Sequence, residues 1–524
     1  MCTTAGAMTS PKLPEFSDFL TAATKHPLVA LCVPIAFDHE TAITLADRYV
    51  DEPYFFLLES AAAGPNARYS FLGFDPVWTW QIDSCTKKTC EYSLHLDGGK
   101  AQSQSLPITD PINALRDLMA RWQVDTVYPK GTRLGGPDTA AMVGATGFFG
   151  FDIGQALEPS IGKAPPKTLG VPDAAFFMPR QFLIVDHLAR RLFVARNIPI
   201  ADRNEAKLRR QFASELANLL EQIETLTSAH QAPPLSLSDE PLDFGHFDAA
   251  LNESEFTSLG VKCLDAVRAG EVFQIQISNR LGRATAARPF DIFRHLRMLN
   301  PSPYMFYYKW QDHHLVGASP EMMVGVQGQR MTHRPIAGTR RRTWDPARDT
   351  AMRQELVASD KERAEHVMLV DLARNDIGRI AAPGSVKVEE LMTVEEYSHV
   401  FHMVSQVVGT LPDTVDAYDA MRVSFPNGTV SGAPKIRATQ LIYELESMSR
   451  EFYAGSLGMF DSRGNLKSTL LIRTIHVAHG KASTQAAAGF VYDSTPAHEW
   501  QETRNKMAAC LLAIQNTLAS KTGT

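Results

Sequence analysis

The chain has 524 residues, of which 44% are hydrophobic and 21% charged, a composition that is ordinary for a folded globular protein. This length exceeds what one small core needs, and it predicts either two domains or one large interwoven domain. The net charge of −6 gives no reason to expect nucleic acid or an acidic membrane surface as a partner.

Targeting and redox signals are weak in this sequence. The N-terminal residues show no charged segment followed by an apolar stretch, and no apolar run approaches the roughly 18–20 residues of a membrane span. The six cysteines lack metal-ligand and redox spacing, and even the closest pair, Cys85 and Cys90, does not form such a motif. We therefore expect a cytoplasmic protein with reduced thiols and no membrane partner.

The first part of the chain is rich in predicted strands. Residues 68–74 and 146–153 have the apolar and aromatic composition of strands, and residues 182–197 predict a hairpin that turns around residues 187–190.

A composition shift divides the chain. A helix is predicted for residues 203–227, where leucines recur at helical spacing, and the Pro- and Ser-rich residues 228–247 that follow predict a linker. We accordingly expect an N-terminal region over residues 1–235 and a catalytic region over residues 236–524.

The part after the linker begins with a helix and a strand. Residues 251–270 predict a helix with a capping signal from Asn252 and Glu255, and residues 272–281 predict the strand. Strands and helices then alternate without the regular rhythm of a Rossmann or barrel fold. The sequence therefore predicts an α+β fold with a large, interwoven, mostly antiparallel β-sheet core flanked by helices.

Two predicted helices carry pairs of glutamates three residues apart, Glu362 with Glu365 and Glu499 with Glu502. Positions i and i+3 share one face of a helix, so each pair presents its two carboxylates together. If the two faces meet, a hard cation must neutralise the charge. Mg²⁺ suits this role because it takes oxygen ligands and keeps positions open for other groups. Taken singly, each pair is more commonly a solvated helix face.

The helix with the first pair, residues 359–379, combines burial signals with many charges. Val367, Leu369, Val370 and Leu372 predict that it packs into the core. Buried charges cost several kcal/mol each unless they are paired or bound to a metal. A core helix held by salt bridges is the alternative to a metal site.

The segment SDKERAEHVMLVDLARNDIGR (residues 359–379) closely resembles the signature of the chorismate-utilising enzymes, and of their anthranilate synthase component I branch in particular. Further blocks of this family follow in order over residues 250–515, and the part before the linker matches more thinly. The blocks are FLLESAAAGPNARYSFLG, GFFGFD, GASPEMM, RPIAGTRRR, FPNGTVSGAPKIRA, LLIRT, AAAGFVYDS and HEWQETRNK. The resemblance implies the chorismate-utilising enzyme fold.

The resemblance also implies a metal site. Glu365 and Glu502 would bind Mg²⁺ directly, Glu362 and Glu499 would act through bound waters, and the metal would hold the ring carboxylate of chorismate. Lys506, one helical turn after Glu502, would place a positive charge near that carboxylate.

Other implied chorismate contacts come from several blocks. Arg473 resembles the arginine that binds the enolpyruvyl carboxylate, a role suited to a planar two-pronged donor, and Tyr453 resembles the tyrosine beside it. The sequence departs from the family at Ala454 and Ala487, where glycines are usual. The remaining contacts implied by the resemblance are Gly338, Thr339, Ala488 and Gly489.

Two positions predict which reaction the family pocket performs. Relatives that add water carry a lysine base where this chain has Gln274, and an amide cannot deprotonate water. Aminodeoxychorismate synthases commonly carry a nucleophilic lysine where this chain has Ala337. The pattern therefore predicts direct attack of ammonia at C2 of chorismate, as in anthranilate synthase. An aminodeoxychorismate synthase and a non-catalytic, tryptophan-sensing subunit remain as alternatives.

The catalytic set is completed by three residues. Glu321 is the candidate general acid for the departing C4 hydroxyl, and His402 is expected to assist the loss of pyruvate. Thr429 lies in a loop that packs against substrate in relatives. Without the family context, Glu321 would be taken for the first acid of a helix and His402 for a core histidine on an apolar helix.

Two further molecules are expected. No GxCxG nucleophile motif of a glutamine amidotransferase occurs, so ammonia must arrive free or from a separate amidotransferase subunit in a hetero-oligomer. Two segments resemble the halves of a tryptophan feedback site, although the first could simply end a buried strand. The residues of this predicted inhibitor site are Leu58, Glu59, Ser60, Asn300, Pro301, Ser302, Tyr304 and Met305.

Overall fold

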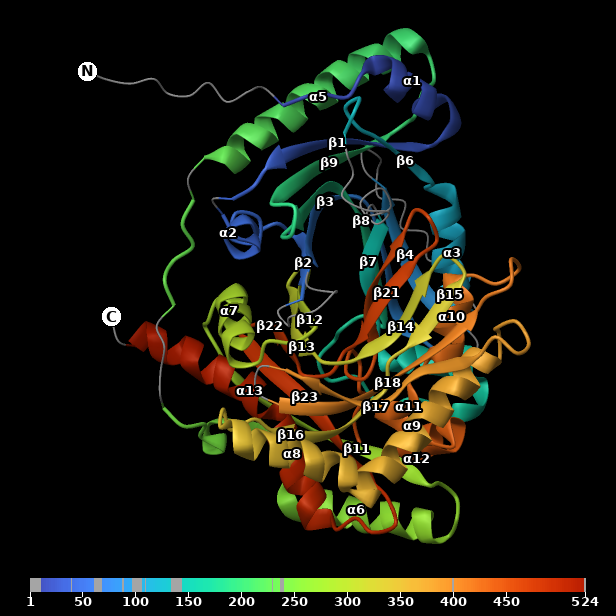
Figure 1. Ribbon diagram of the computed structural model, residues 1–524, viewed down its shortest axis with the longest axis vertical. Coiled ribbons are helices and arrows are strands. Elements are labelled where there is room, and N and C mark those ends of the chain that lie inside the picture. Colours follow the sequence, from blue (N-terminus) through green and yellow to red (C-terminus); the bar gives the residue numbers. More distant parts are fainter. Residues whose placement is uncertain are drawn as a thin grey trace.

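The computed structural model describes most of the chain, with gaps in its first part, in the linker and at both ends. The described residues are 11–38, 40–60, 68–86, 89–96, 106–108, 110–132, 144–228, 230–235, 240–397 and 400–522. Two β-sheets occupy the centre, helices α1 and α5 lie at the top beside β1 and β9, and α6 lies at the bottom (Figure 1).

The two long strands β3 and β8 are the structural root of both sheets. They pair antiparallel along their length, with Tyr69 opposite Asp186 and Ile82 opposite Ala174. Nearly every side chain of β8 is buried, which explains why its sequence is mostly apolar and not alternating, with an interruption only at Arg180 and Gln181. The outer edge of each strand is divided along its length between two partners, β2 and β4 on β3, and β9 and β7 on β8, so the pair extends into two different sheets.

The first sheet extends from one end of this pair. Its strand order is β6–β1–β9–β8–β3–β2–β12–β13–β22–β23–β11, with β10 and β19 beside β11. The strands are β1 (Leu28–Ala36), β2 (Tyr54–Glu59), β3 (Tyr69–Cys85), β6 (Val124–Val127), β8 (Ala174–Asp186), β9 (Arg191–Pro199), β10 (Asp248–Ala249), β11 (Gln274–Ala284), β12 (Tyr304–Trp310), β13 (His313–Ser319), β19 (Gly432–Ala433), β22 (Thr474–Ala478) and β23 (Lys481–Phe490).

The second sheet extends from the other end of β3 and β8. Its order is β5–β4–β3–β8–β7–β20–β21–β14–β15–β18, and β16 and β17 also pair with the long strand β18. Its further strands are β4 (Cys90–Leu96), β5 (Leu106–Ile108), β7 (Gly144–Phe149), β14 (Met322–Gln327), β15 (Arg330–His333), β16 (Ile336–Arg341), β17 (Lys387–Glu396), β18 (Val400–Thr410), β20 (Ser456–Asp461) and β21 (Leu466–Leu470).

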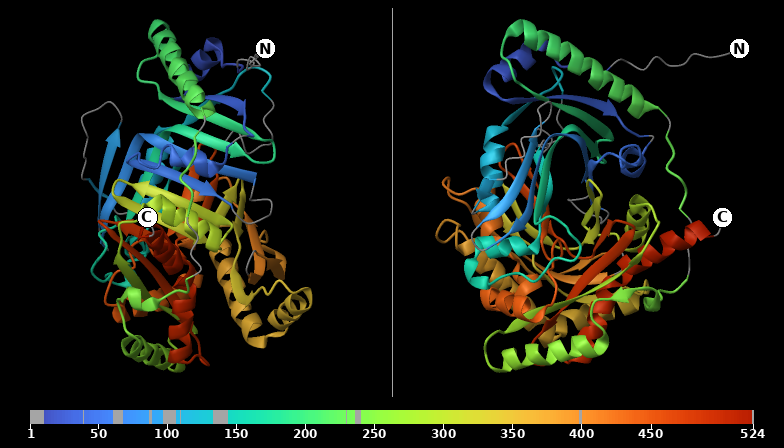
Figure 2. Two further views of the ribbon diagram at one scale, coloured as in Figure 1. Left: turned by 90° about the vertical axis from the view of Figure 1, so that its left-hand side faces the viewer. Right: turned by 180° about the vertical axis from the view of Figure 1, so that it is seen from behind.

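The helices cover the outer parts of these sheets. Two of them decide the site: α13 packs on β23 of the first sheet, and α9 packs on β16 and β18 of the second. The left-hand view of Figure 2 shows α9 and α13 in two separate arms of the molecule. The helices are α1 (Phe16–Lys25), α2 (Ala42–Asp47), α3 (Pro111–Arg121), α4 (Gly154–Leu157), α5 (Glu205–Thr227), α6 (Glu253–Arg268), α7 (Pro289–Leu299), α8 (Pro346–Ala358), α9 (Asp360–Gly378), α10 (Ala417–Ser424), α11 (Gly428–Ser431), α12 (Lys435–Leu445) and α13 (Pro496–Thr522).

The predicted fold class is confirmed. Among the described residues only the pairing of β1 with β6 is parallel, and all other strand pairings are antiparallel. The fold is interwoven because β2 pairs with β12 and β7 pairs with β20, which joins residues on either side of the predicted boundary at 235/236. The division into two regions itself stays a prediction.

The predictions that rest on short-range sequence patterns, the hairpin and the helix cap, are confirmed. The hairpin turns between Asp186 and Arg191, and α6 begins with the reciprocal capping box of Asn252 and Glu255. Burial of α9 is partial, since Val367 is 46% exposed while Leu369 and Val370 are buried. The Val367 side chain therefore lies outside the core, although the sequence predicted that it packs there.

The redox state of one cysteine pair differs from the prediction. The expectation of reduced thiols is wrong for one pair, since Cys85 and Cys90 form a disulfide that joins the paired ends of β3 and β4. Sequence spacing could not show this, because the register of the hairpin is what places the two side chains opposite each other. None of the helices in the described ranges is long and apolar enough to cross a membrane.

The two alanines that replace family glycines differ in backbone conformation. Ala454 has φ +63°, in the left-handed region, whereas Ala487 lies within the regular strand β23. An alanine in the left-handed region costs about 1–2 kcal/mol, and this cost is absent for glycine.

We therefore predict different stabilities for Ala454→Gly and Ala487→Gly. Both lose a buried methyl group, worth about 0.8 kcal/mol, and gain backbone entropy in the unfolded chain. Only Ala454→Gly also relieves the left-handed alanine, so its free energy of unfolding should stay within about 1 kcal/mol of the parent while Ala487→Gly loses about 1–2 kcal/mol. Thermal and urea unfolding followed by circular dichroism measure this, and equal losses in the two variants would contradict it.

Candidate active site

The two glutamate pairs meet between the arms of the molecule. Glu362 and Glu365 lie on α9, and Glu499 and Glu502 lie on α13, each pair one helical turn apart as predicted. Burial raises the pKa of Glu365, and the neighbouring carboxylates of Glu362 and Glu502 raise it further. Burial, followed by repulsion from Glu502, raises the pKa of Glu499 to about 6. The four carboxylates therefore form one electrostatically coupled cluster.

Cationic and amide groups partly compensate this cluster. Lys506 forms an ion pair of 2.6 Å with Glu502, and Arg340 forms one of 3.1 Å with Glu362. Burial opposes ionisation of Glu502, but Lys506 outweighs it and lowers the pKa of that carboxyl. Gln274 donates from Nε2 to Oε1 of Glu365 at 3.2 Å.

The donor set fits a hard divalent cation. Glu499 is 2% exposed, and its Oε2 has no hydrogen-bond partner among the described residues. Ligand atoms of Glu499, Glu502 and His498 lie within 4.8 Å of one another. Carboxylate oxygens without partners are what Mg²⁺ takes as ligands. His498 was not predicted, and its only sequence signal is its place directly before Glu499.

Glu321 occupies the bend between β13 and β14, not a helix terminus. Its side chain is 4% exposed, and the hydroxyl of Thr429 donates to its Oε1 at 2.9 Å. Burial raises the pKa of Glu321 to about 8, against weaker opposing effects of Thr429, Lys506 and Arg473. The carboxyl is therefore protonated at neutral pH, the state that a general acid requires.

His402 lies on strand β18, so the expected helix around it is wrong. Its Nδ1 is 3.0 Å from the hydroxyl of Thr339 and 3.3 Å from the carbonyl oxygen of Gly338. Burial and, to a smaller extent, Arg473 lower the pKa of His402 to about 4, which leaves the imidazole neutral. The apolar run resembled a helix because β18 is covered on both faces.

Two glycines allow close approach at the site. Gly338 has φ +66°, and a Cβ there would lie 3.0 Å from Oε2 of Glu362. Gly489 on β23 lies so close to Gln274 and Gln276 that a Cβ would be 2.8 Å from the Nε2 atom of each. A side chain at Gly338 would displace the carboxylate of Glu362, and one at Gly489 would displace the amides of Gln274 and Gln276.

The predicted carboxylate-binding residues line the same region. Arg473 has φ +48° in the link between β21 and β22, and burial lowers its pKa although Glu321 opposes this. The Tyr453 hydroxyl hydrogen-bonds the backbone of Ala487, and Lys506 donates to the Ala487 carbonyl oxygen at 3.0 Å. Ala488, the next residue of β23, is fully buried. A substrate carboxylate would thus meet Arg473 and Lys506 beside Glu321.

A second cavity lies between the sheets, closer to the root formed by β3 and β8. It encloses about 570 Å³, part of it open to solvent, and β2 and β12 form one wall while β20 and β21 form the other. Leu58, Glu59, Ser60, Tyr304 and Met305 line it as predicted, because β2 and β12 pair with Met305 opposite Glu59.

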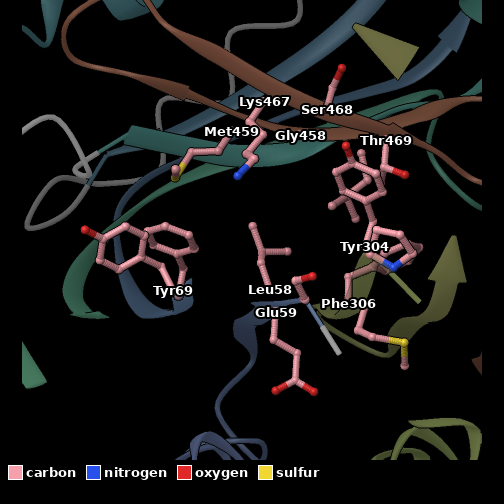
Figure 3. A pocket seen from close by; sticks show the side chains of 15 residues that line it. Leu58, Glu59, Tyr69, Tyr304, Phe306, Gly458, Met459, Lys467, Ser468 and Thr469 are labelled. Carbon is pink, nitrogen blue, oxygen red and sulfur yellow. The ribbon is translucent and has the colours of Figure 1, made fainter. Parts of the chain in front are cut away.

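The prediction for this cavity was incomplete in two ways. Asn300, Pro301 and Ser302 lie in the turn before β12 and are not among its lining residues. Figure 3 shows Met459 and Lys467 on the wall opposite Leu58, and the Glu59 carboxylate points away from that wall. The residues of this opposite wall, none of which was predicted, are Leu457, Gly458, Met459, Lys467, Ser468 and Thr469, and Tyr69, Phe71, Pro303 and Phe306 are further lining residues outside the prediction. No local pattern marks them, since only tertiary pairing brings β20 and β21 to β2.

Hydrogen bonds connect the wall of the cavity to the backbone of the active-site residue Glu321. The hydroxyl of Thr469, which lines the cavity, donates to the backbone oxygen of Glu321 at 2.7 Å. The amide of Leu470 donates to the same oxygen at 3.1 Å. Strand β21 therefore supports the backbone of the buried acid on one side and the cavity wall on the other.

Comparisons with known proteins agree with this geometry. Residues 57–512 match the family described as chorismate binding enzyme, and the chain belongs to this family. It is 34% identical to anthranilate synthase component 1 of Acetivibrio thermocellus over 507 residues, which covers 96% of this chain and 98% of that protein. The predicted resemblance to anthranilate synthase component I is confirmed.

The chain is also similar to an aminodeoxychorismate synthase component and to a solved structure of an anthranilate synthase component. Aminodeoxychorismate synthase component 1 of Bacillus subtilis strain 168 is 35% identical over 462 residues, covering 88% of this chain and 91% of that protein. The crystal structure of anthranilate synthase component I from Streptococcus pneumoniae TIGR4 has a TM-score of 0.69 at 34% identity, covering 86% of this chain and 93% of the other.

The raised pKa of Glu321 predicts a pH-dependent stability. Between the pKa of an unfolded carboxyl, about 4.3, and the folded value of about 8, the unfolded chain releases a proton that the folded chain keeps. Stability is therefore lost as pH rises through this window. Glu321→Gln removes the effect, so its free energy of unfolding should exceed that of the parent by roughly a few kcal/mol at pH 8 and by much less at pH 5.

Denaturant titrations of both proteins at the two pH values measure this difference. Glu221→Gln, an exposed change in the middle of α5, is the control and should show no such pH dependence. A gain for Glu321→Gln that is equal at pH 5 and pH 8 would contradict the assignment of a protonated buried acid.

Proposed function

We propose that this protein is the synthase component of an anthranilate synthase, which converts chorismate and ammonia into anthranilate, pyruvate and water. The observation that carries the proposal is the buried amide of Gln274, bonded to Glu365 within the carboxylate cluster. A group at this place can orient a nucleophile but cannot deprotonate water. The relatives named anthranilate synthase component 1 support the same assignment.

The amide of Gln274 also offers a place for ammonia. Its Nε2 is committed to Glu365, and its Oε1 is buried and lacks a hydrogen-bond partner among the described residues. An unpaired buried acceptor is costly, and an N–H of ammonia would satisfy it. We assign to Gln274 the orientation of ammonia toward C2 of the ring.

The carboxylate cluster is proposed to hold Mg²⁺. Glu365 and Glu502 would be its direct ligands, and Glu362 and Glu499 would act through water. The bound ion would neutralise the cluster and bind the ring carboxylate of chorismate. Lys506 and Arg473 would provide the cationic surroundings of the two substrate carboxylates.

The acid and the base act in separate steps. In the first, the C2–N bond forms while the C4–O bond breaks, and Glu321 gives its proton to the hydroxyl, which leaves as water. The new ammonium group then returns one proton to the Glu321 carboxylate. In the second, the proton at C2 is removed, the enolpyruvyl C3–O bond breaks and the ring becomes aromatic. The departing enolpyruvate takes up a proton at its methylene carbon and becomes pyruvate. The neutral imidazole of His402, held by Thr339, is assigned to assist removal of the C2 proton.

The ammonia is proposed to come from a separate glutamine amidotransferase subunit in a hetero-oligomer. The free cysteines of the described residues, Cys32, Cys263 and Cys510, are all buried, so none of them can serve as the exposed nucleophile of a glutaminase. The chain alone should therefore use ammonium salts. A cytoplasmic location belongs to the same proposal.

The second cavity is proposed to bind tryptophan as a feedback inhibitor. The cavity is mostly apolar, and Leu58, Tyr304 and Met305 can contact an indole ring. Ser60 contributes a polar group at the edge of the cavity. Because Thr469 joins the cavity wall to the backbone of Glu321, a ligand that displaces β21 would act directly on the acid.

The metal and the reaction are tested together on purified chain with chorismate, Mg²⁺ and ammonium. Anthranilate should form, chelation of the metal should abolish it, and Glu502→Gln should lower kcat/KM by about 100-fold or more, since a lost ligand costs at least as much as an outer partner. Asp371→Asn, an exposed change farther along α9, is the control and should keep full activity. Formation of para-aminobenzoate would instead identify the aminodeoxychorismate reaction.

The inhibitor site is tested by removing a polar group from its edge. Ser60→Ala alters no group proposed to act on chorismate and adds no atom against β21, so the rate without tryptophan should stay within about twofold of the parent. The inhibition constant for tryptophan should rise by about tenfold or more, because loss of one polar contact to a charged group of the ligand costs about 1.4 kcal/mol or more. Steady-state assays over a tryptophan series measure both values. Unchanged inhibition would remove Ser60 from the site.

A further inference from the structure

Arg450 is a buried cation outside the set of predicted catalytic residues. It is 1% exposed, and four hydrogen bonds hold its guanidinium. Two go to Glu446, from Nε at 2.9 Å and from one terminal nitrogen at 2.8 Å. The other two go to backbone carbonyl oxygens, Val430 at 2.7 Å and Gln276 at 2.9 Å. One planar fork therefore joins α11 to β11.

The carboxylate of Glu446 extends this connection. Its Oε1 also accepts from the amide and from the hydroxyl of Ser278, both at 2.8 Å. The ion pair is thus anchored to β11 at Gln276 and at Ser278. Removal of one member of this buried pair would leave an uncompensated charge, so each side chain needs the other in order to remain buried.

Both elements whose backbone carbonyl oxygens Arg450 binds, α11 and β11, carry a group of the active site. Val430 directly follows Thr429, whose hydroxyl donates to Glu321. Gln276 lies against Gly489 and is two residues from Gln274 on β11. The guanidinium also lies 5.8 Å from the ring centroid of Tyr453.

A second buried arginine provides the contrast. Arg280 is 7% exposed and bonds Gln485, Thr168 and the carbonyl oxygen of Ser449. Arg280 lies on β11, the strand to which Arg450 is bonded, and faces Glu451. Among the described residues, no hydrogen bond connects Arg280 to α11.

Arg280 is linked to the fork indirectly, since Gln485 donates to the hydroxyl of Ser278 and Ser449 directly precedes Arg450. Because none of its own hydrogen bonds to the described residues reaches α11, Arg280→Lys measures how far loosening the neighbouring buried network alone moves the pH profile.

We propose that Arg450 is a positioning residue that keeps Thr429 in hydrogen-bonding contact with Glu321 and keeps Gln276 against the Gly489 strand. The inference rests on the proposed function, because Glu321 is its general acid. Arg450 touches no reacting atom. It acts through the α11 backbone, whose register against β11 the guanidinium sets.

The expected signature lies in the pH profile. Thr429 lowers the pKa of Glu321, while burial raises it, and Lys506, Arg473 and Tyr304 are the other ionisable groups that act on this carboxyl. Loss of the Thr429 contact raises the pKa of Glu321 further. The basic limb of the kcat profile, where the acid loses its proton, then moves to higher pH.

The test compares Arg450→Lys, Thr429→Val and the double variant with Arg280→Lys, in the ammonium-dependent assay. Arg450→Lys should lower kcat at least about tenfold near pH 7 with the KM for chorismate within about threefold, because misplacement of a catalytic partner acts on the transition state. The basic limb should move upward in Arg450→Lys and in Thr429→Val, and the double variant should show no further shift. Arg280→Lys should keep the parental limb.

The outcomes separate the two proposals. If the parent forms no anthranilate, the proposed function is wrong. If the parent is active and Arg450→Lys leaves the basic limb unchanged, or shifts it no more than Arg280→Lys does, Arg450 is purely structural. Should Arg450→Lys fail to fold, Glu446→Gln loosens the same fork while keeping the side-chain volume. It must then move the limb in the same direction, and an unmoved limb rejects the inference.

Discussion

The mutual approach of four carboxylates from α9 and α13 is the constraint on which the site depends. The two helices are mounted on different sheets, α9 on β16 and β18 and α13 on β23. The repulsion between the carboxylates is therefore opposed by the packing of each helix on its own sheet. Lys506, Arg340 and the amide of Gln274 compensate part of the charge. Both sheets originate at the β3–β8 pair, and this shared root determines how the two arms face each other.

The carboxylate cluster and the cavity both lie between the two sheets. The cluster lies between α9 and α13, and the mostly apolar cavity lies nearer the root, since Tyr69 and Phe71 of β3 line it together with the β2–β12 and β20–β21 walls. Strand β21 belongs to both, since Thr469 lines the cavity and holds the backbone of Glu321. A ligand bound in the cavity would therefore need no long path through the protein to affect Glu321, because one strand separates the cavity from the acid.

In the proposed reaction, the choice of nucleophile depends on groups that the site lacks as well as on groups that it has. The amide at Gln274 and the methyl group at Ala337 provide neither a base for water nor a nucleophile of their own. The protonated Glu321 and the neutral His402 then supply opposite proton-transfer capacities in one water-poor region, and burial is the main cause of both pKa shifts.

Sequence alone determined what short-range pattern and residue type can determine. The glutamate pairs, the Asn252–Glu255 capping box and the hairpin before Arg191 follow from periods of two and 3.6 residues, and the chemistry at Gln274 follows from its identity. Only the tertiary structure decided the strand conformation of His402, the Cys85–Cys90 disulfide and the hydrogen bonds by which Arg450 joins α11 to β11. It alone also placed Met459 and Lys467 opposite Leu58. These features depend on strand register and on contacts between residues far apart in the chain, which no local pattern encodes.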